Sequence, residues 1–166
     1  MSVFDYNSIY DDNVWVTLYP NAMGFQDKFL SLCKEHVEDS EFPNVSITVE
    51  QFKTGGVFFN KEHTKMLCVS FTKSQFKKLG IFFRAQQFGN LMYFTLLKTV
   101  DKGFWDAVRG RSQDEVLTNI RLKCKNLAQW EEISCLNNFG NLIFVKVLEA
   151  LDPDYKSKKN LLSMER

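Results

Sequence analysis

The sequence lacks the short motifs that most often reveal a catalytic or cofactor site. It contains no Gly-x-Gly-x-x-Gly or P-loop pattern, no Gly-x-Ser-x-Gly nucleophile elbow and no Cys-x-x-Cys pair. Only two histidines are present, so general bases and imidazole ligands are scarce. These absences favour a protein that acts by binding, and they predict no cofactor and no metal site.

Long apolar runs and the features of a secretion signal are missing as well. No stretch of about 18 apolar residues occurs, which argues against a transmembrane helix. Residues 1–6 are acidic and lack the apolar core of a signal peptide. The four cysteines are dispersed, at Cys33, Cys68, Cys124 and Cys135, and are expected to be reduced thiols. We therefore expect a cytoplasmic protein that does not enter a membrane.

The composition is that of an ordinary globular chain. Hydrophobic residues make up 45% and charged residues 25% of the 166 residues, which predicts one domain over residues 1–166. Sixteen phenylalanines are more than a typical core requires. Most should be buried, and a few are expected to be exposed at a binding surface.

Charge is distributed unevenly along the chain. Residues 1–60 carry three basic and nine acidic residues, residues 61–125 thirteen and five, and residues 126–166 five and six. A total net charge of +1 therefore hides a basic middle segment of net charge +8. Such asymmetry is typical of a surface that binds or steers an acidic partner.

The first half, residues 1–72, is predicted to be rich in strands. Val45, Ile47 and Val49 alternate with polar residues, which is the period of a half-buried strand. Apolar residues spaced by three and four predict a helix over 22–38. The predicted strands are 14–18, 45–52, 56–60 and 65–71, with turns at 54–56 and 60–64.

The second half, residues 73–166, is predicted to be helical. Thr72 and Gln75 have the spacing of a capping box at the start of a helix. The predicted helices are 73–88, 91–108, 113–138 and 141–151, followed by a short basic tail helix after Pro153. Strands at 91–100 and 142–150 remain as alternatives. The predicted fold class is α+β, with an N-terminal three- or four-stranded antiparallel sheet packed against a C-terminal helical bundle.

Two nine-residue segments resemble each other, namely 86–94 and 137–145, which lie 51 residues apart. Each contains Phe-Gly-Asn, with glycine suited to end one helix and asparagine to cap the next. We interpret both as junctions between helices that look alike because the same capping requirements apply. The alternative is a duplicated helical hairpin.

Residue pairs that suggest catalysis or metal binding are few. Cys33 and His36 have a spacing that two metal ligands can adopt, but a structural zinc needs four ligands, and a buried thiol explains Cys33. Glu50 and Lys53 faintly resemble the acidic–lysine pairs of metal-dependent nucleases. A separation of three on a strand puts their side chains on opposite faces, which argues against a shared site.

Basic residues of the middle segment are the leading candidate site. On a helix over 73–88, Lys73, Lys77 and Arg84 would share one stripe beside the apolar face. The full set of candidate binding residues is Lys73, Lys77, Lys78, Arg84, Arg109, Arg111, Arg121, Lys123 and Lys125. Three aromatic residues, Phe82, Phe88 and Trp105, could stack on bases if they are exposed.

Three functional hypotheses follow. The first is a non-enzymatic interaction module, such as an inhibitor, adaptor or immunity-type protein, that binds a protein partner with an acidic patch. The second is nucleic-acid binding through the same residues, because lysine and arginine neutralise phosphates. The third is a small enzyme whose site involves His36 or His63 and is assembled only by the fold. The sequence does not define an oligomeric state.

Overall fold

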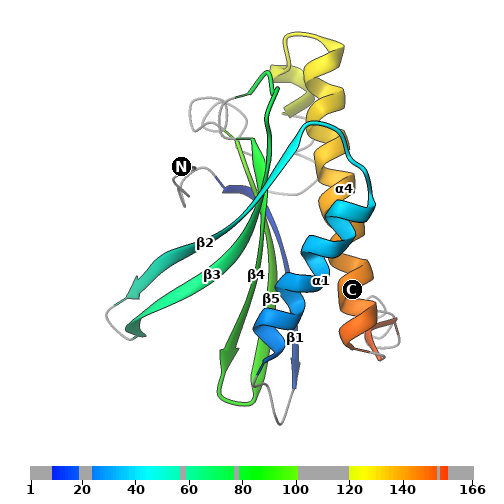
Figure 1. Cartoon of the computed structure of the whole chain (residues 1–166). Helices are drawn as coiled ribbons and strands as arrows, with labels where there is room; N and C mark the ends of the chain where they lie inside the picture. The colour runs from blue at the N-terminus through cyan, green and yellow to red at the C-terminus, as the bar shows by residue number, and fades with distance from the viewer. Residues whose placement is uncertain are drawn as a thin grey trace.

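The computed structural model describes the backbone of residues 9–18, 24–56, 59–76, 79–100, 120–152 and 154–156. Side chains are described in the same ranges except at 10–13, 18, 52–56 and 59–63. The elements in these ranges are β1 (Ile9–Leu18), α1 (Phe25–Asp39), β2 (Val45–Gly56), β3 (Phe59–Phe71), β4 (Gly80–Phe88), β5 (Leu91–Thr99) and α4 (Leu127–Leu151) (Figure 1). No helix in the described ranges is long and apolar enough to cross a membrane.

The five strands form one sheet in the order β1-β5-β4-β3-β2, and every neighbouring pair is antiparallel. Strands β2 to β5 follow one another as neighbours, whereas β1 pairs with β5 at one edge. Because β1 and β2 lie at opposite edges, α1 crosses one face of the sheet between them (Figure 1). The α+β class and the antiparallel sheet are confirmed. The predicted three or four strands are corrected to five, and the described helices do not form a clear bundle.

Helix α1 and the first strands agree with the sequence predictions. The predicted strand 14–18 lies within β1, the predicted helix 22–38 largely coincides with α1, and the strand predicted at 45–52 lies within β2. The predicted turn at 60–64 is wrong, because these residues continue a single strand, β3. The predicted turn at 54–56 is wrong as well, because these residues belong to β2, and Gly56 is still paired to Phe59.

The predicted helices over 73–88 and 91–108 are wrong where the structure describes them, because 80–88 and 91–99 are the central strands β4 and β5. The strand alternative for 91–100 is thus confirmed. Central strands bury both faces and therefore carry nearly continuous apolar runs, in which a helical spacing also occurs by chance. The proposed capping box is not formed: the Thr72 hydroxyl donates to the Asn44 carbonyl at 3.0 Å, back toward the start of β2.

Helix α4 spans a region predicted as two helices. Asn126 caps its start, because its side chain accepts a hydrogen bond from the Gln129 amide at 2.9 Å. The predicted break near Gly140 is absent, and 137–145 lies inside α4, whereas 86–94 is a β-hairpin with Gly89 at φ 59°. The two similar segments therefore have different structures, so neither junctions between helices nor a duplicated helical hairpin explains both.

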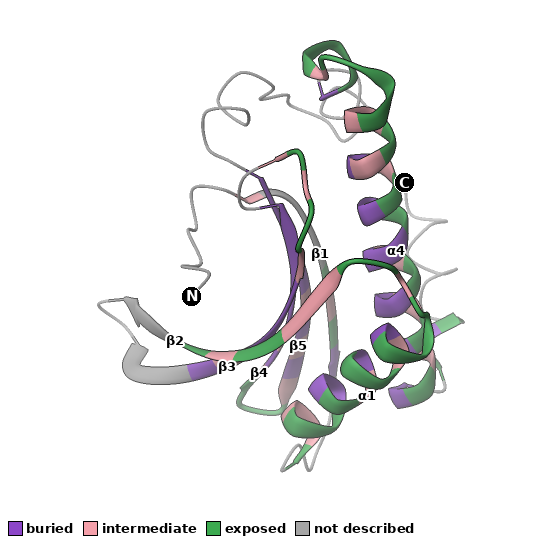
Figure 2. Cartoon of the chain, turned by 45° about the horizontal axis from the view of Figure 1, so that its top comes forward, coloured by how far each residue is buried: buried purple, intermediate pink, exposed green. Residues whose placement is uncertain are grey.

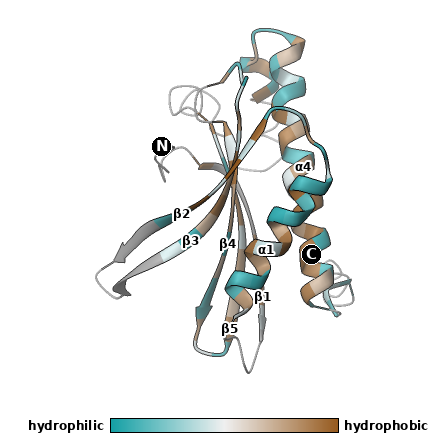
Figure 3. Ribbon diagram, in the orientation of Figure 1, coloured by the Kyte–Doolittle hydropathy of each residue, from teal (hydrophilic) through white to brown (hydrophobic). Residues whose placement is uncertain are grey.

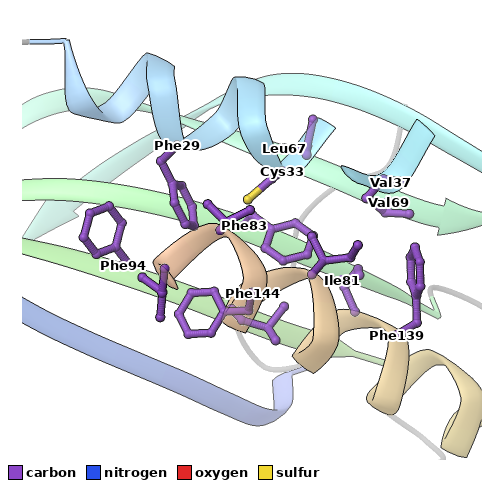
Figure 4. Packing of buried hydrophobic residues seen from close by; sticks show 14 of the residues in the cluster. Phe29, Cys33, Val37, Leu67, Val69, Ile81, Phe83, Phe94, Phe139 and Phe144 are labelled. Carbon is purple, nitrogen blue, oxygen red and sulfur yellow. The ribbon is translucent and has the colours of Figure 1, made fainter. Parts of the chain in front are cut away.

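The main core lies between the sheet and the two helices, on what we call the helix face of the sheet. Phe29 and Cys33 of α1 and Phe144 of α4 point toward Phe83 and Phe94 of the sheet (Figure 4). The Phe29 and Phe94 rings are 4.9 Å apart between centroids. Both helices expose their outer sides and bury the sides that face the sheet (Figure 2).

The opposite side of the sheet, which we call the far face, carries a second and smaller cluster. Its buried members are Met66, Cys68, Phe82 and Leu97, against which Ile9 packs. Adjacent strand residues point to opposite faces, so this cluster alternates with the residues of the main core. The strands are accordingly hydrophobic where they converge (Figure 3).

Candidate interaction surface

The start of α4 and the turn after β3 lie together at one end of the sheet. The Gln75 amide donates a hydrogen bond to Oε2 of Glu132 at 3.2 Å, which links the two segments. The turn closes locally, since the Phe76 amide donates to the Ser74 hydroxyl at 2.9 Å. This end of the molecule is at the top of Figure 1, where the chain enters α4.

Residues 121–127 protrude at this end between two anchor points. Before them, Ile120 is fully buried and accepts a hydrogen bond at its carbonyl from the Cys124 amide at 3.0 Å. Near their C-terminal end, the Lys125 amide donates to Oε1 of Gln129 at 2.8 Å, and the Asn126 side chain accepts a hydrogen bond from the Gln129 amide at 2.9 Å. The pair resembles a capping box, except that the residue before the N-cap supplies the backbone donor. The backbone is thus fixed at both ends, and the side chains between are presented to solvent.

The exposed side chains of this segment are basic and apolar. Arg121, Lys123 and Lys125 are exposed, and residues 120–130 contain no acidic residue, so their net charge is +3. Leu122 and Leu127 are exposed to 74% and 69%, more than any other large hydrophobic residue described. We call Arg121, Leu122, Lys123, Lys125 and Leu127 the basic–apolar segment.

Four of the nine predicted binding residues are exposed at this end of the molecule, namely Lys73, Arg121, Lys123 and Lys125. Lys73 lies in the turn that contacts α4 through Gln75. In the part of the chain that the structure describes, none of the four forms an ion pair. Lys77, Lys78, Arg109 and Arg111 lie outside the described residues.

Arg84 does not belong to this surface, and the predicted helical stripe with Lys73 and Lys77 is wrong. Arg84 lies on β4 and pairs across the sheet with Thr95, whereas its neighbour Phe83 points into the main core. Its side chain is half-buried on the far face, and burial lowers the pKa of its guanidinium.

The positive charge of the basic middle segment is therefore only partly exposed at the surface. Lys98 is buried, and Lys65 forms an ion pair with Asp27 of the acidic first third at 2.9 Å. Among the described residues no acidic side chain forms an ion pair with the basic–apolar segment. The described acidic residues nearest in sequence, Glu131 and Glu132, belong to α4, and Glu132 accepts the hydrogen bond from the Gln75 amide.

The aromatic residues proposed for base stacking do not accompany the basic surface. Phe82 is buried in the far-face cluster, and Phe88 is at the opposite end of β4, about 26 Å from Gly80 for an extended strand of this length. Trp105 lies outside the described residues. Of the three aromatic residues proposed for stacking, neither of the two that the structure describes accompanies these cations.

Among the residues considered for catalysis, Glu50 lies close enough to Cys68 for its charge to act on the thiol, and the backbones of Lys53 and His63 are paired across β2 and β3. Burial raises the pKa of the Cys33 thiol well above its usual value, and burial followed by the charge of Glu50 raises the pKa of Cys68 to about 12, so both thiols stay protonated near neutral pH. His36 is half-buried at the end of α1, while the side chains of Lys53 and His63 are not described. Among the described residues no group of three potential metal ligands occurs.

Two residues of this surface escaped the sequence prediction, Leu122 and Leu127. The helical spacing placed Leu127 on a buried face of a helix over 113–138, but the chain breaks that helix at residues 124–126. The Asn126-x-x-Gln129 capping signature, together with a leucine between two cations, is the signal that could have identified an exposed segment here.

The protein was compared with models of protein families, with curated proteins and with solved structures, and none of the three comparisons gave a match.

Proposed function

We propose that the protein is a non-enzymatic interaction module, of the inhibitor, adaptor or immunity type, that binds an acidic patch of a protein partner. The observation that carries this proposal is the basic–apolar segment: three cations and two exposed leucines on a backbone anchored at both ends. A protein surface that combines apolar anchors with unpaired cations suits a partner with apolar pockets rimmed by carboxylates.

Electrostatics at the start of α4 favour an anionic partner. The positive end of the helix macrodipole lies beside Lys125 and Leu127 and has the same sign as the side-chain charges. The leucines decide between partner classes, because they add favourable free energy only where apolar surface is buried. Nucleic-acid backbones offer phosphates but little apolar surface, so a protein partner uses both features and nucleic acid only one.

The test is a comparison of two charge variants with equal net charge. The first variant combines Arg121→Glu, Lys123→Glu and Lys125→Glu in the basic–apolar segment. The control combines Lys28→Glu, Lys34→Glu and Lys146→Glu, three exposed lysines on the outer sides of α1 and α4. Proteins captured from a lysate by the unaltered chain, the variant and the control are quantified by mass spectrometry.

A protein captured by the unaltered chain and the control, but lost with the segment variant, supports the proposal. Equal capture by all three chains overturns it. A parallel anisotropy titration with labelled single- and double-stranded DNA and RNA identifies the competing function. Binding with a log–log salt slope of about −0.9 per neutralised phosphate, abolished in the segment variant, would replace the protein partner by nucleic acid.

A further inference from the structure

The side of α4 that faces away from the sheet carries a continuous exposed stripe. Its members recur at spacings of four, four, three and four residues, so they fall within about 80° of one another around the helix. All of them are exposed, whereas the side of α4 that faces the sheet is buried (Figure 2). We call this set the outer stripe: Leu127, Glu131, Cys135, Asn138 and Leu142.

Both ends of the outer stripe are apolar, and its middle is polar. Leu127 is exposed to 69% and Leu142 to 53%, and the other three members lie between them. A stripe with a leucine at each end presents the same pattern when it is read in either direction. Such a pattern matches its own copy when two helices run antiparallel, as in a two-fold symmetric dimer.

An antiparallel pair of outer stripes is complementary residue by residue. With the two-fold axis beside Cys135, Leu127 lies level with Leu142 of the second copy, because the two are equally far from the midpoint. Glu131 then lies level with Asn138 of the second copy, whose amide N–H can donate to the carboxylate. Spacings of four and three are those of the side-chain ridges that pack into the grooves of a neighbouring helix.

The end of α1 is acidic and lies beside the middle of α4. Residues 35–44 contain no lysine or arginine, and Phe42 packs against Phe139 of α4 with ring centroids 4.4 Å apart. The four acidic side chains are exposed, and one of them, Glu38, forms a surface ion pair with Lys34 at 3.7 Å. We call these four residues the acidic end: Glu35, Glu38, Asp39 and Glu41.

The same antiparallel pairing brings opposite charges close together. Phe139, beside the acidic end, lies level with residue 130 of the second copy, which is about 8 Å of helix rise from Lys125. The basic–apolar segment of one copy therefore approaches the acidic end of the other, and the two-fold axis repeats this contact. Apolar, polar and charged groups are thus matched in one arrangement.

We propose that the protein forms a homodimer in which two outer stripes pack antiparallel and each basic–apolar segment contacts the acidic end of the other copy. This inference rests on the proposed function, because it assigns a partner to the basic–apolar segment. The outer stripe, about 22 Å long and about 10 Å wide, covers far less than the roughly 800 Å² per partner of a standard interface. The charged contacts are therefore needed, and the dimer is weak and sensitive to salt.

Sedimentation velocity over a series of protein concentrations measures the dissociation constant of the dimer. Leu142→Glu puts a carboxylate against Leu127 twice in each dimer and should raise this constant by about tenfold or more. Ala150→Glu, at an exposed position of α4 outside the outer stripe, is the matched control and should leave the constant unchanged. In about 1 M salt, where the Debye length is about 3 Å, the constant of the unaltered chain should also rise by about tenfold or more.

Two charge variants test the contact between the copies directly. The first reverses the three cations of the basic–apolar segment, as in the lysate experiment. The second reverses three carboxylates of α1: Glu35→Lys, Glu38→Lys and Asp39→Lys. Each variant alone faces like charges across the dimer and should stay monomeric, whereas an equal mixture pairs opposite charges at both contacts and should form a heterodimer. Heterodimer formation also shows that both variants are folded, and a mixture that stays monomeric overturns the inference.

A short bismaleimide crosslinker, which joins two thiols, tests the register. It should join Cys135 of one copy to Cys135 of the other, and Cys135→Ser should abolish this product. A chain that is monomeric at every concentration, a dimer that Leu142→Glu does not weaken, or a dimer without the Cys135 crosslink overturns the inference.

The outcome is separable from that of the lysate experiment. A monomeric chain whose capture of another protein still depends on the basic–apolar segment overturns this inference alone. A dimer with equal capture from the lysate by all three chains overturns the proposed function alone.

Discussion

Gly140 in the middle of α4 lies directly against Ile81 of β4. A Cβ at position 140 would be 3.3 Å from Cδ1 and 3.4 Å from Cγ2 of Ile81, and 3.6 Å from Cδ1 of Leu96. The glycine thus lets the helix approach the sheet closely at a point where both strand residues are fully buried. Its role is close packing and not the ending of a helix.

This relationship predicts that Gly140→Ala destabilises the protein although alanine favours helices. Alanine gains about 1 kcal/mol in helix propensity, while overpacking a rigid core costs about 1–3 kcal/mol. Because Ile81 is β-branched and enclosed, we expect a net loss of about 1 kcal/mol in urea unfolding. Ile81→Val removes Cδ1 and should relieve most of that loss, giving a coupling of at least about 0.5 kcal/mol in a double-mutant cycle. A Gly140→Ala protein that is more stable than the unaltered chain would show that the Ile81 side chain can move to accommodate the added methyl group.

The cap of α4 gives a second prediction. Asn126 accepts the Gln129 amide hydrogen bond at 2.9 Å, so Asn126→Ala should lower the free energy of unfolding by about 1 kcal/mol. Asn126→Asp is the matched control, because a carboxylate also accepts this bond and favours a helix N-terminus. Thermal unfolding of both variants measures the effect. Equal losses in the two variants would show that the cap contributes nothing specific.

The edges of the sheet could be predicted from the sequence, whereas its centre could not. β2 alternates apolar and polar residues because one of its faces is exposed to solvent. β1 contains a short apolar run that ends before Pro20. β4 and β5 are buried on both faces: Ile81 and Phe83 join the main core, while Phe82 joins the far-face cluster. Runs such as 81–83 and 91–94, which are apolar at every position, have no period of two, so a spacing of three and four across these strands predicted helices wrongly.

Only part of the candidate site could be predicted, because charge can be read from the sequence whereas the position of a residue in the fold cannot. Arg121, Lys123 and Lys125 are identified by charge alone, and they are exposed as expected. Grouping Arg84 with Lys73 depends on a helix over 73–88, whereas strand β4 places Arg84 on the far face of the sheet. The length over which β3 pairs with β4 is decided by long-range register and has no local sequence signal.

The raised pKa of the Cys68 thiol predicts that the folded protein becomes less stable at alkaline pH. Burial, assisted by Glu50, raises the pKa of its thiol from 9.0 to about 12 in the folded protein. Below pH 9 the thiol is protonated in both states; above it the unfolded chain loses the proton first, so the unfolded state is favoured as pH rises toward 12. Urea unfolding at several pH values between 8 and 11 should show a falling free energy of unfolding. The slope should be shallower in Cys68→Ala, and identical slopes would contradict the assigned pKa.

Exposed leucines that serve binding should contribute little to folding. Leu122→Asn and Leu127→Asn are each expected to change the free energy of unfolding by less than about 0.5 kcal/mol, because both side chains project into solvent. Leu136→Ala in the buried side of α4 is the internal comparison and should cost about 2–5 kcal/mol. Urea unfolding measures all three variants. If the Leu122→Asn and Leu127→Asn substitutions also lower the free energy of unfolding by several kcal/mol, both leucines pack against the protein in solution and cannot serve as apolar anchors for a partner. If the substitutions leave the free energy of unfolding unchanged but reduce partner capture, the exposed leucines contribute to binding.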